Sequence, residues 1–402
     1  MSWKPGDLIP REQAAALLKG VADEVPRAGL LAKLERARSE KRPLLVKFGA
    51  DPNAPHLHLG HTVSLRLLRQ FQDFGHIVYF LIGDFTAMIG DPSGRSSTRP
   101  ALTHAEVKAN AATYQKQVWK VLDKRRTKIV FNSKWCSALR FDDVIRLASG
   151  YTVARLLERD DFMNRYKEGR PIGLHEFLYP IVQGYDSVVL KADVEVCGTD
   201  QIFNCHVARA LQEGAGQEPE VIMALPLLEG TDGVHKMSKS LGNAIGITEP
   251  PGEIYGKLLS IPDSLISKYW SLLLGEEPDP GKSPRDAKHG LARRVVERYH
   301  GAAAAETAAS RFEKQFVLRE VPDDAPIAVM PADAVKNGRV WVIRLLTVTG
   351  AAPSRAEAER LVRQGAVELD GERISDPRAD LEIRDGAVLK VGKRRYLKLR
   401  LR

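Results

Sequence analysis

The sequence predicts an α/β domain built on a parallel sheet, followed by an α-helical domain and a small α+β domain. Five apolar runs, several of them ending in glycine-containing turns, are typical of parallel strands that are buried on both faces. Residues 250–320 carry mainly helical patterns. Residues 338–402 combine two helical patterns with a hairpin and a stretch that alternates basic and apolar side chains.

The five apolar runs give the expected strands at residues 44–48, 77–82, 128–132, 192–197 and 221–226. Helical patterning falls before the first strand, at residues 11–40, and between the strands, at residues 62–74, 104–125 and 138–178. In an open α/β sheet, ligands bind beyond the carboxyl ends of the strands. We therefore look for site residues in the turns that follow these strands.

The C-terminal domain is expected to contain helices over residues 340–346 and 354–364. A hairpin is expected to turn at Asp370-Gly371, because this dipeptide favours tight turns. Residues 321–333 contain three prolines and are interpreted as part of a linker.

Size and charge indicate the kind of partner. A chain of 402 residues with 44% hydrophobic residues is long enough for two or three domains. The formal net charge is +9, and residues 339–402 hold 15 Lys and Arg against 9 Asp and Glu, which leaves +6 in that segment. A charge run is usually a solvated face, but this asymmetry favours a nucleic acid as partner.

The cysteines and the apolar runs indicate the compartment. The three cysteines, Cys136, Cys197 and Cys205, form no Cys-x-x-Cys motif and are read as reduced thiols. His206 beside Cys205 is not enough for a zinc site, so no metal site is expected. No run approaches the roughly 18 apolar residues that a membrane span needs. We expect a soluble, cytoplasmic protein without a membrane partner.

His58 and His61 follow the first expected strand and open the helical pattern after it. The first N–H groups of a helix have no partner within the helix, and the helix dipole favours negative charge there. The pair could therefore clamp a phosphate. A His-x-x-His pair is also common as a structural or metal-binding pair, and this alternative stays open.

Lys236, Lys239 and Ser240 lie in a loop after the fifth expected strand. Such a loop can close over a nucleotide and neutralise a departing diphosphate. The alternative is a solvated lysine-rich turn.

Charged residues follow the other expected strands. Asp51 can receive an ammonium group or simply stabilise its turn. In the loop at residues 83–95, Asp91 can bind an amine, while Arg95 and the nearby Arg99 can meet phosphates; a plain connecting turn is the alternative. The Asp200 carboxylate can accept hydrogen bonds from the hydroxyls of a ribose.

Tyr179, Gln183 and Asp186 are spaced so that they share one face of a helix. An exposed helix face is one reading. The apolar residues around them indicate burial instead, and buried Tyr, Gln and Asp side chains need partners that a small polar ligand can supply.

In this order and context, the two nucleotide motifs resemble those of class I aminoacyl-tRNA synthetases. Together with the face at residues 179–186, the loop at residues 198–201 and a tail similar to S4-type RNA-binding domains, they resemble the bacterial tyrosyl-tRNA synthetase family over nearly the whole chain. Two departures stand out: Lys47 replaces a common Tyr, and Glu195 replaces a common Gln. The first resembles a bacterial subgroup, so tyrosine is kept as the expected substrate.

The resemblance implies four regions. These are a Rossmann-like catalytic domain at 1–247 with a helical insertion at about 133–190, an α-helical anticodon-side domain at 248–320, a linker at 321–337 and an S4-like domain at 338–402.

The resemblance also implies the site residues. The tyrosine site would comprise Lys47, Asp51, Thr86, Asp91, Tyr179, Gln183, Asp186 and Gln201. The ATP site would comprise Gly49, His58, Gly60, His61, Gly198, Asp200, Lys236, Met237 and Lys239. The catalytic groups would be His58, His61, Lys236, Lys239, Ser240, Arg95 and Arg99. Asp186 would bond the phenol, while Asp91, Tyr179 and Gln183 would hold the amine.

The implied reaction activates L-tyrosine with ATP to tyrosyl-adenylate and then transfers the tyrosyl group to the 3′ end of tRNA(Tyr). ATP would be a substrate and would carry Mg²⁺, and no tightly bound cofactor is expected. The resemblance further implies a homodimer. Two enzyme alternatives remain, a tryptophanyl-type synthetase and a nucleotidyltransferase with a His-x-x-His clamp, beside a non-catalytic RNA-binding protein.

Overall fold

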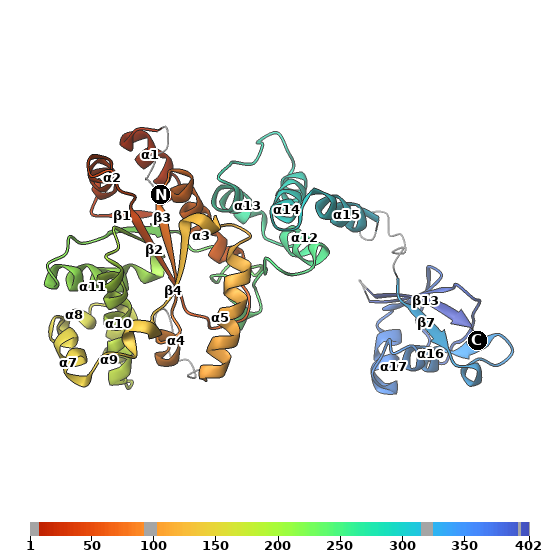
Figure 1. The fold of residues 1–402 in the computed structure, drawn as a ribbon. Coiled ribbons are helices and arrows are strands. Elements are labelled where there is room, and N and C mark those ends of the chain that lie inside the picture. Colours follow the sequence, from red (N-terminus) through yellow and green to blue (C-terminus); the bar gives the residue numbers. More distant parts are fainter. Residues whose placement is uncertain (1–7, 92–102, 315–324, 393–394, 402) are drawn as a thin grey trace. The chain divides into compact units, whose positions relative to one another are not determined.

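The computed structural model describes residues 8–91, 103–314, 325–392 and 395–401. The chain forms two compact units, Met1–Glu306 and Thr307–Arg402 (Figure 1). The expected division of the first unit near residue 247 stays a prediction. Across the described ranges, the helices are too short or too polar to cross a membrane.

A six-stranded sheet forms the centre of the first unit, in the order β1-β6-β5-β2-β3-β4. Its strands are β1 (Asp23–Val25), β2 (Leu45–Ala50), β3 (Ile77–Ile82), β4 (Thr127–Phe131), β5 (Val194–Gly198) and β6 (Val221–Leu225). The five expected strands are all present and run parallel. The short strand β1, which the sequence pattern did not predict, pairs antiparallel with β6 at the sheet edge.

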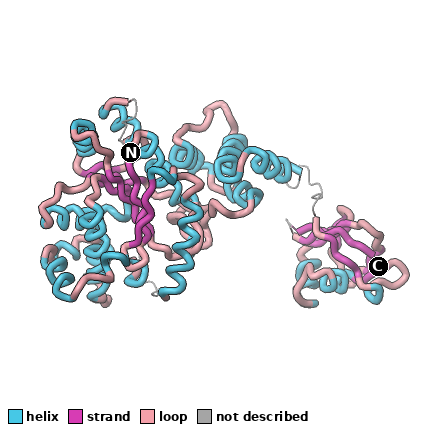
Figure 2. The backbone as a smooth tube through the Cα atoms, in the orientation of Figure 1, coloured by secondary structure: helices cyan, strands magenta, loops and turns pink. Residues whose placement is uncertain are grey.

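The strand order reverses between β2 and β5. From β2 the chain proceeds outward to β3 and β4, whereas β5 and β6 lie on the other side. This is a topological switch point, and a crevice opens there at the carboxyl ends of the strands. Helices lie on both sides of the strands (Figure 2).

Three helices position the site. α3 (Leu59–Asp73) follows β2 and packs on β2, β3 and β5. α10 (Leu174–Leu190) packs along α11 (Ile202–Gly214). At Gly184 of α10, a Cβ atom would lie 3.0 Å from the Ala208 backbone, so glycine permits the close approach of these two helices.

Further helices complete the first unit. They are α1 (Pro10–Leu17), α2 (Gly29–Ser39), α4 (Thr86–Ile89), α5 (His104–Val118), α6 (Ser133–Cys136), α7 (Phe141–Ser149), α8 (Val153–Leu156), α9 (Asp160–Lys167), α12 (Pro251–Leu259), α13 (Ile266–Tyr269) and α14 (Pro284–His300). α15 (Ala302–Phe312) spans the boundary between the units. Residues 263–274, within the range expected to be mainly helical, form a 3₁₀ turn, α13 and a π-helical segment at Trp270–Leu274.

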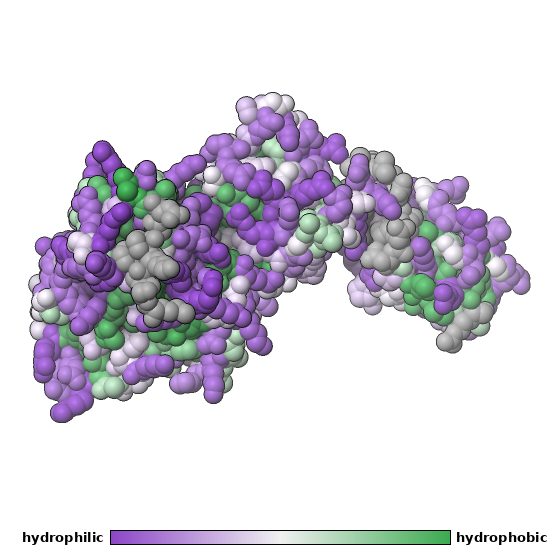
Figure 3. Space-filling view, turned by 45° about the horizontal axis from the view of Figure 1, so that its top comes forward, coloured by the Kyte–Doolittle hydropathy of each residue, from purple (hydrophilic) through white to green (hydrophobic). Residues whose placement is uncertain are grey.

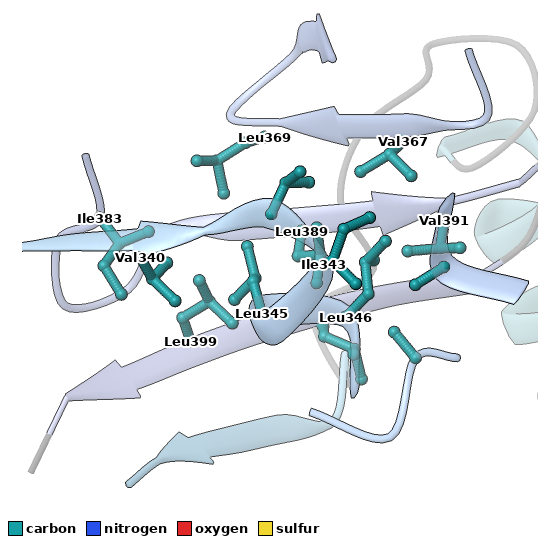
Figure 4. Close-up of a cluster of buried hydrophobic side chains, with 14 of the residues drawn as sticks. Val340, Ile343, Leu345, Leu346, Val367, Leu369, Ile383, Leu389, Val391 and Leu399 are labelled. Carbon is teal, nitrogen blue, oxygen red and sulfur yellow. The ribbon is translucent and has the colours of Figure 1, made fainter. Parts of the chain in front are cut away.

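The second unit has a five-stranded sheet in the order β10-β9-β12-β13-β7 and a two-stranded sheet of β11 and β8. Its strands are β7 (Ile327–Met330), β8 (Arg339–Trp341), β9 (Val367–Leu369), β10 (Glu372–Ile374), β11 (Asp380–Glu382), β12 (Val388–Val391) and β13 (Arg395–Leu401). The helices α16 (Val342–Val348) and α17 (Arg355–Arg363) complete it. In Figure 4, side chains such as Ile343, Leu346 and Leu389 point toward one another in its core.

The expected hairpin turn at Asp370-Gly371 is confirmed, and both residues have positive φ. Two other expectations for the second unit need correction. Residues 327–330, placed in the expected linker, form β7 and pair with β13, because Met330 is fully buried in the core. The helix expected from residue 340 begins at Val342, since Val340 belongs to β8.

Candidate active site

A cavity of about 290 Å³ opens at the carboxyl ends of β2, β5 and β6. All eight residues of the expected tyrosine site line it: Lys47, Asp51, Thr86, Asp91, Tyr179, Gln183, Asp186 and Gln201. Eight of the expected ATP-site residues also line it: Gly49, His58, Gly60, His61, Gly198, Asp200, Lys236 and Met237. Lys239 and Ser240 do not line it. Arg95 and Arg99 lie outside the described residues.

Asp186 is 1% exposed and is held by two nitrogen donors that the sequence pattern did not reveal. The Trp135 indole donates to Oδ1 at 2.7 Å, and the Asn132 amide donates to Oδ2 at 3.3 Å. Burial raises the pKa of Asp186 to about 7, although Lys47, Trp135 and Asn132 oppose the shift. The carboxyl group can therefore accept a further hydrogen bond from a ligand hydroxyl when it is ionised.

Lys47 and Glu195 face each other in the register of β2 and β5. The Lys47 ammonium is fully buried and lies 3.1 Å from Glu195 Oε1. It donates to Ser187 Oγ at 2.6 Å and to the Gln183 carbonyl oxygen at 3.4 Å. Burial alone would lower its pKa, but Glu195 and other carboxylates outweigh burial and raise the pKa of Lys47.

Asp51 accepts hydrogen bonds from two lining residues. The Tyr179 hydroxyl donates to Oδ2 at 2.9 Å, and the Thr86 hydroxyl donates to Oδ1 at 2.7 Å. Glycine is needed at residue 83, because a Cβ atom there would lie 2.0 Å from Asp51 Oδ1. The turn after β2 thus holds a fixed carboxylate rather than a free one.

A second polar cluster connects Asp91, Gln201, Gln183 and Asn204. The Gln201 amide donates to Asp91 Oδ2 at 3.1 Å. Asn204, a further residue that the sequence analysis missed, donates to Gln183 Oε1 at 3.1 Å and to Gln201 Oε1 at 2.8 Å. These contacts orient the acceptor groups that an ammonium group needs.

His58 and His61 lie at the start of α3 with their ring centroids 3.9 Å apart. Burial lowers the pKa of His58 well below its usual range and the pKa of His61 to about 4, so both rings are neutral at pH 7. The Nδ1 atom of His58 has no hydrogen-bond partner among the described residues. Gly60 leaves room for this ring, since a Cβ atom there would lie 3.0 Å from it.

The expectation that the N–H groups at this helix start are free is wrong for three of them. The Leu59 N–H donates to the Ile245 carbonyl at 2.9 Å, and the His61 N–H donates to the His58 carbonyl at 2.9 Å. The His58 N–H donates to His61 Nδ1 at 3.2 Å. The segment around Ile245 supplies a partner that local sequence cannot reveal.

The lysine loop reaches the same cavity through Lys236 and Met237. Lys236 Nζ lies 2.7 Å from Asp200 Oδ2, so the expected ribose acceptor is paired with an expected phosphate ligand. Lys239 lies close enough for its charge to contribute to the lowered pKa of both histidines. No group of three or more His, Cys, Asp or Glu side chains in the described ranges is arranged to hold a metal ion.

The structure combines a doubly wound sheet, a histidine pair at the start of the helix after β2 and a lysine loop after the last parallel strand. This combination is typical of class I tRNA synthetases. The family model for tRNA synthetases class I (W and Y) matches residues 39–317, and the chain belongs to this family. The S4 domain model matches residues 340–385.

Relatives that match nearly the whole chain show to which part of this family it belongs. The chain is 52% identical to the tyrosine–tRNA ligase of Moorella thermoacetica, covering 96% of this chain and 95% of the relative. It is 49% identical to the enzyme of the same name from Carboxydothermus hydrogenoformans, covering 98% and 99%. The chain belongs to the tyrosine–tRNA ligase family.

Solved structures share the fold. A tyrosyl-tRNA synthetase from Archaeoglobus fulgidus, complexed with L-tyrosine, matches with a TM-score of 0.61 and 23% identity, covering 75% of this chain and all of that one. A C-terminally truncated mitochondrial tyrosyl-tRNA synthetase from Aspergillus nidulans matches with a TM-score of 0.62 and 22% identity, covering 77% and 97%.

Proposed function

We propose that this protein is a tyrosine–tRNA ligase, which activates L-tyrosine with ATP and transfers the tyrosyl group to tRNA(Tyr). The observation that carries the proposal is the arrangement of one cavity. It contains a buried hydroxyl acceptor, Asp186, together with the His58/His61 pair and Lys236. A substrate with a phenol at one end and a carboxylate near a nucleotide fits this arrangement.

In the first step, a carboxylate oxygen of tyrosine attacks the α-phosphorus of ATP, and the bond to the diphosphate breaks. In the second step, a ribose hydroxyl at the 3′ end of the tRNA attacks the carbonyl carbon of the adenylate, and AMP leaves with the bonding electrons. Both steps need positioning and charge stabilisation rather than a protein nucleophile.

We assign the phosphate contacts to His58, His61 and Lys236. Neutral imidazoles can donate to phosphate oxygens through an N–H group, and the lysine supplies positive charge. Lys239, Ser240, Arg95 and Arg99 complete the proposed group by the family resemblance. Mg²⁺ would arrive with ATP, because phosphate oxygens are the ligands it prefers.

We assign the amine of tyrosine to Asp91, Tyr179 and Gln183, and the phenol to Asp186. The remaining expected roles are adenylate binding by Asp200 and amino-acid binding by Gln201. A phenylalanine in this cavity would leave the Asp186 carboxyl group without its partner. Tyrosyl-tRNA synthetases are the standard example of such rejection by an unpaired polar group.

The second unit is proposed to bind tRNA(Tyr). The S4 domain model matches residues 340–385 of this unit, and the excess of basic residues between Arg339 and Arg402 supports binding to phosphates. Since charged tRNA is consumed by translation, we propose the cytoplasm as the place of action.

We also propose a homodimer. α7 has no buried residue, and several apolar side chains between residues 141 and 174 are exposed, with Phe141 at 80% and Leu174 at 82%. Hydrophobic residues also reach the surface on the face shown in Figure 3. A contiguous exposed apolar patch marks an interaction site, and a self-complementary patch is typical of a two-fold dimer.

Light scattering tests the dimer. Phe141→Asp should halve the measured mass, whereas Ile327→Asp, at an apolar residue of the second unit that is 52% exposed, should leave it unchanged. A wild-type mass equal to one chain would contradict the proposal.

Amino-acid-dependent exchange of labelled diphosphate into ATP, run with each standard amino acid, tests the function. Exchange with tyrosine alone is the expected result. Exchange with tryptophan alone would move the protein to the tryptophanyl type, and exchange with no amino acid would remove the ligase function.

A further inference from the structure

Three buried ionisable side chains lie directly behind Asp186: Lys47 on β2, Glu195 on β5 and Glu220 just before β6. All three are at most 2% exposed. Lys47 and Glu195 also line the cavity. A buried cluster of ions lowers the stability of the folded protein unless its charges are matched. Its position beside a binding cavity therefore suggests a role in binding.

The cluster is connected through one hydroxyl. Lys47 donates to Ser187 Oγ at 2.6 Å, and Ser187 donates to Glu220 Oε1 at 3.0 Å. The ammonium therefore has three near partners: Glu195, Ser187 and the Gln183 carbonyl. Because Gln183 and Ser187 belong to α10, these contacts tie the ammonium to the helix that carries Asp186.

The two glutamates lie against each other. Oε2 of Glu195 and Oε2 of Glu220 both lack a donor within the described part of the chain. Burial and the neighbouring Glu195 raise the pKa of Glu220 well above its usual range, whereas Lys47 holds the pKa of Glu195 below its own. Burial and Glu195 thus favour the protonated form of Glu220, and its proton can satisfy both orphaned oxygens. The cluster then holds one cation and one anion.

We propose that Lys47 is a positioning and specificity-determining residue, whose ammonium favours the ionised form of Asp186, which accepts the hydroxyl of a para-hydroxyphenyl amino acid. Glu195 and the proton-bearing Glu220 hold that ammonium in place. This inference rests on the proposed function, because it assigns the selectivity of the same cavity.

Charges around Asp186 act in opposite directions, which makes the inference testable. Among the electrostatic influences on Asp186 itself, Lys47 lowers its pKa and Glu195 raises it, with Lys47 the stronger. Other ionisable groups near Asp186 include the Cys136 thiol on α6 and the Tyr179 phenol on α10. Burial raises the pKa of both, so they stay neutral between pH 6 and 8.

The experiment measures kcat/KM for tyrosine and phenylalanine in diphosphate exchange from pH 6 to 9, with the full chain. For the wild type, the tyrosine-to-phenylalanine ratio should rise with pH as Asp186 ionises. Lys47→Met should lower the ratio about tenfold at pH 7, since a hydrogen bond to a charged acceptor is stronger than one to a neutral group. It should also move the rise to higher pH. Glu195→Gln should move the rise to lower pH.

Lys33→Met is the matched control. Lys33 is also buried, at 4% exposure, and pairs with Glu218 at 3.0 Å, but it does not line the cavity. Its ratio and profile should match the wild type. If Lys47→Met does not fold, Glu195→Gln and the charge-balanced Lys47→Met/Glu195→Gln variant still test the inference. The double variant should show a pH dependence of the tyrosine-to-phenylalanine ratio close to that of the wild type.

Shifts of the same sign in Lys47→Met and Glu195→Gln, or an unchanged ratio in both, would overturn the inference and leave the function standing. Absence of tyrosine-dependent exchange in the wild type would instead overturn the proposed function.

Discussion

Tyr179 donates its hydroxyl hydrogen to Oδ2 of Asp51 at 2.9 Å, which joins α10 to the turn after β2. Both residues line the cavity. Tyr179→Phe removes this donor and should raise KM for tyrosine about fivefold, because a neutral donor to a carboxylate contributes about 1 kcal/mol or more. Diphosphate exchange at varied tyrosine concentration measures the effect.

The matched control for that substitution is Tyr255→Phe. Tyr255 is also buried, and its hydroxyl lies 2.8 Å from His289 Nδ1, but it does not line the cavity. It should leave KM for tyrosine unchanged. Equal increases in both variants would show that the effect is not local to the Tyr179–Asp51 contact.

Trp135→Phe removes the 2.7 Å donor to Asp186 Oδ1. The pKa of Asp186 should rise further, and tyrosine-dependent exchange at pH 7 should fall roughly tenfold in kcat/KM, in the range for losing a hydrogen bond to a charged group. Trp270→Phe, which loses a 3.1 Å bond to the Ala287 carbonyl outside the cavity, is the control. Unaltered exchange in Trp135→Phe would contradict the role of this donor.

His61→Ala should reduce the rate of adenylate formation much more than the affinity for tyrosine, since its ring lies with His58 rather than beside Asp186. Stopped-flow rates and equilibrium binding of tyrosine separate the two effects. Because burial lowers the pKa of His61 to about 4, the wild-type rate should show no histidine titration between pH 6 and 8. Equal losses in rate and affinity would refute the assignment.

Asp186 should make the folded protein less stable as pH rises. Burial raises its pKa from an ordinary 3.8 to about 7, so its contribution to the free energy of unfolding is complete below pH 4 and is lost as pH rises through 7. Asp186→Asn abolishes this titration. Urea unfolding without tyrosine should show the wild type losing more stability between pH 5 and 8 than the variant; parallel curves would rule this out.

Removing residues 321–402 should spare tyrosine-dependent exchange and lower kcat/KM for tRNA charging by tenfold or more, on the order expected when several phosphate contacts are lost. The cut precedes β7, because Ile327–Met330 belong to the second unit's sheet. A variant that charges tRNA as well as the full chain would contradict RNA binding by this unit.

Much of the site follows from local pattern. The spacing of Tyr179, Gln183 and Asp186 predicts one helix face, and the structure places all three on the cavity. The run at residues 77–82 predicts a strand, and β3 spans Ile77–Ile82. Both predictions succeed because strand and helix periodicities are short-range properties.

The partners of these residues could not be predicted in the same way. Trp135 and Asn132 reach Asp186 across about 50 positions of the chain. Glutamate is a residue type that is normally exposed, yet Glu220 is fully buried. The Leu59 N–H, expected to be free at the start of α3, donates to the Ile245 carbonyl instead. Each miss depends on tertiary packing, which no local periodicity contains.

The pairing of Lys47 with Glu195 also limits which substitutions can arise at these two positions during evolution. The two codons are far apart, but losing either side chain alone leaves a buried charge without its counterpart, at a cost of about 3–5 kcal/mol. A lineage can therefore exchange this pair only by changing both positions together or through a destabilised ancestor. Anyone who wishes to re-engineer the cavity for an unnatural amino acid should randomise the two positions as one unit.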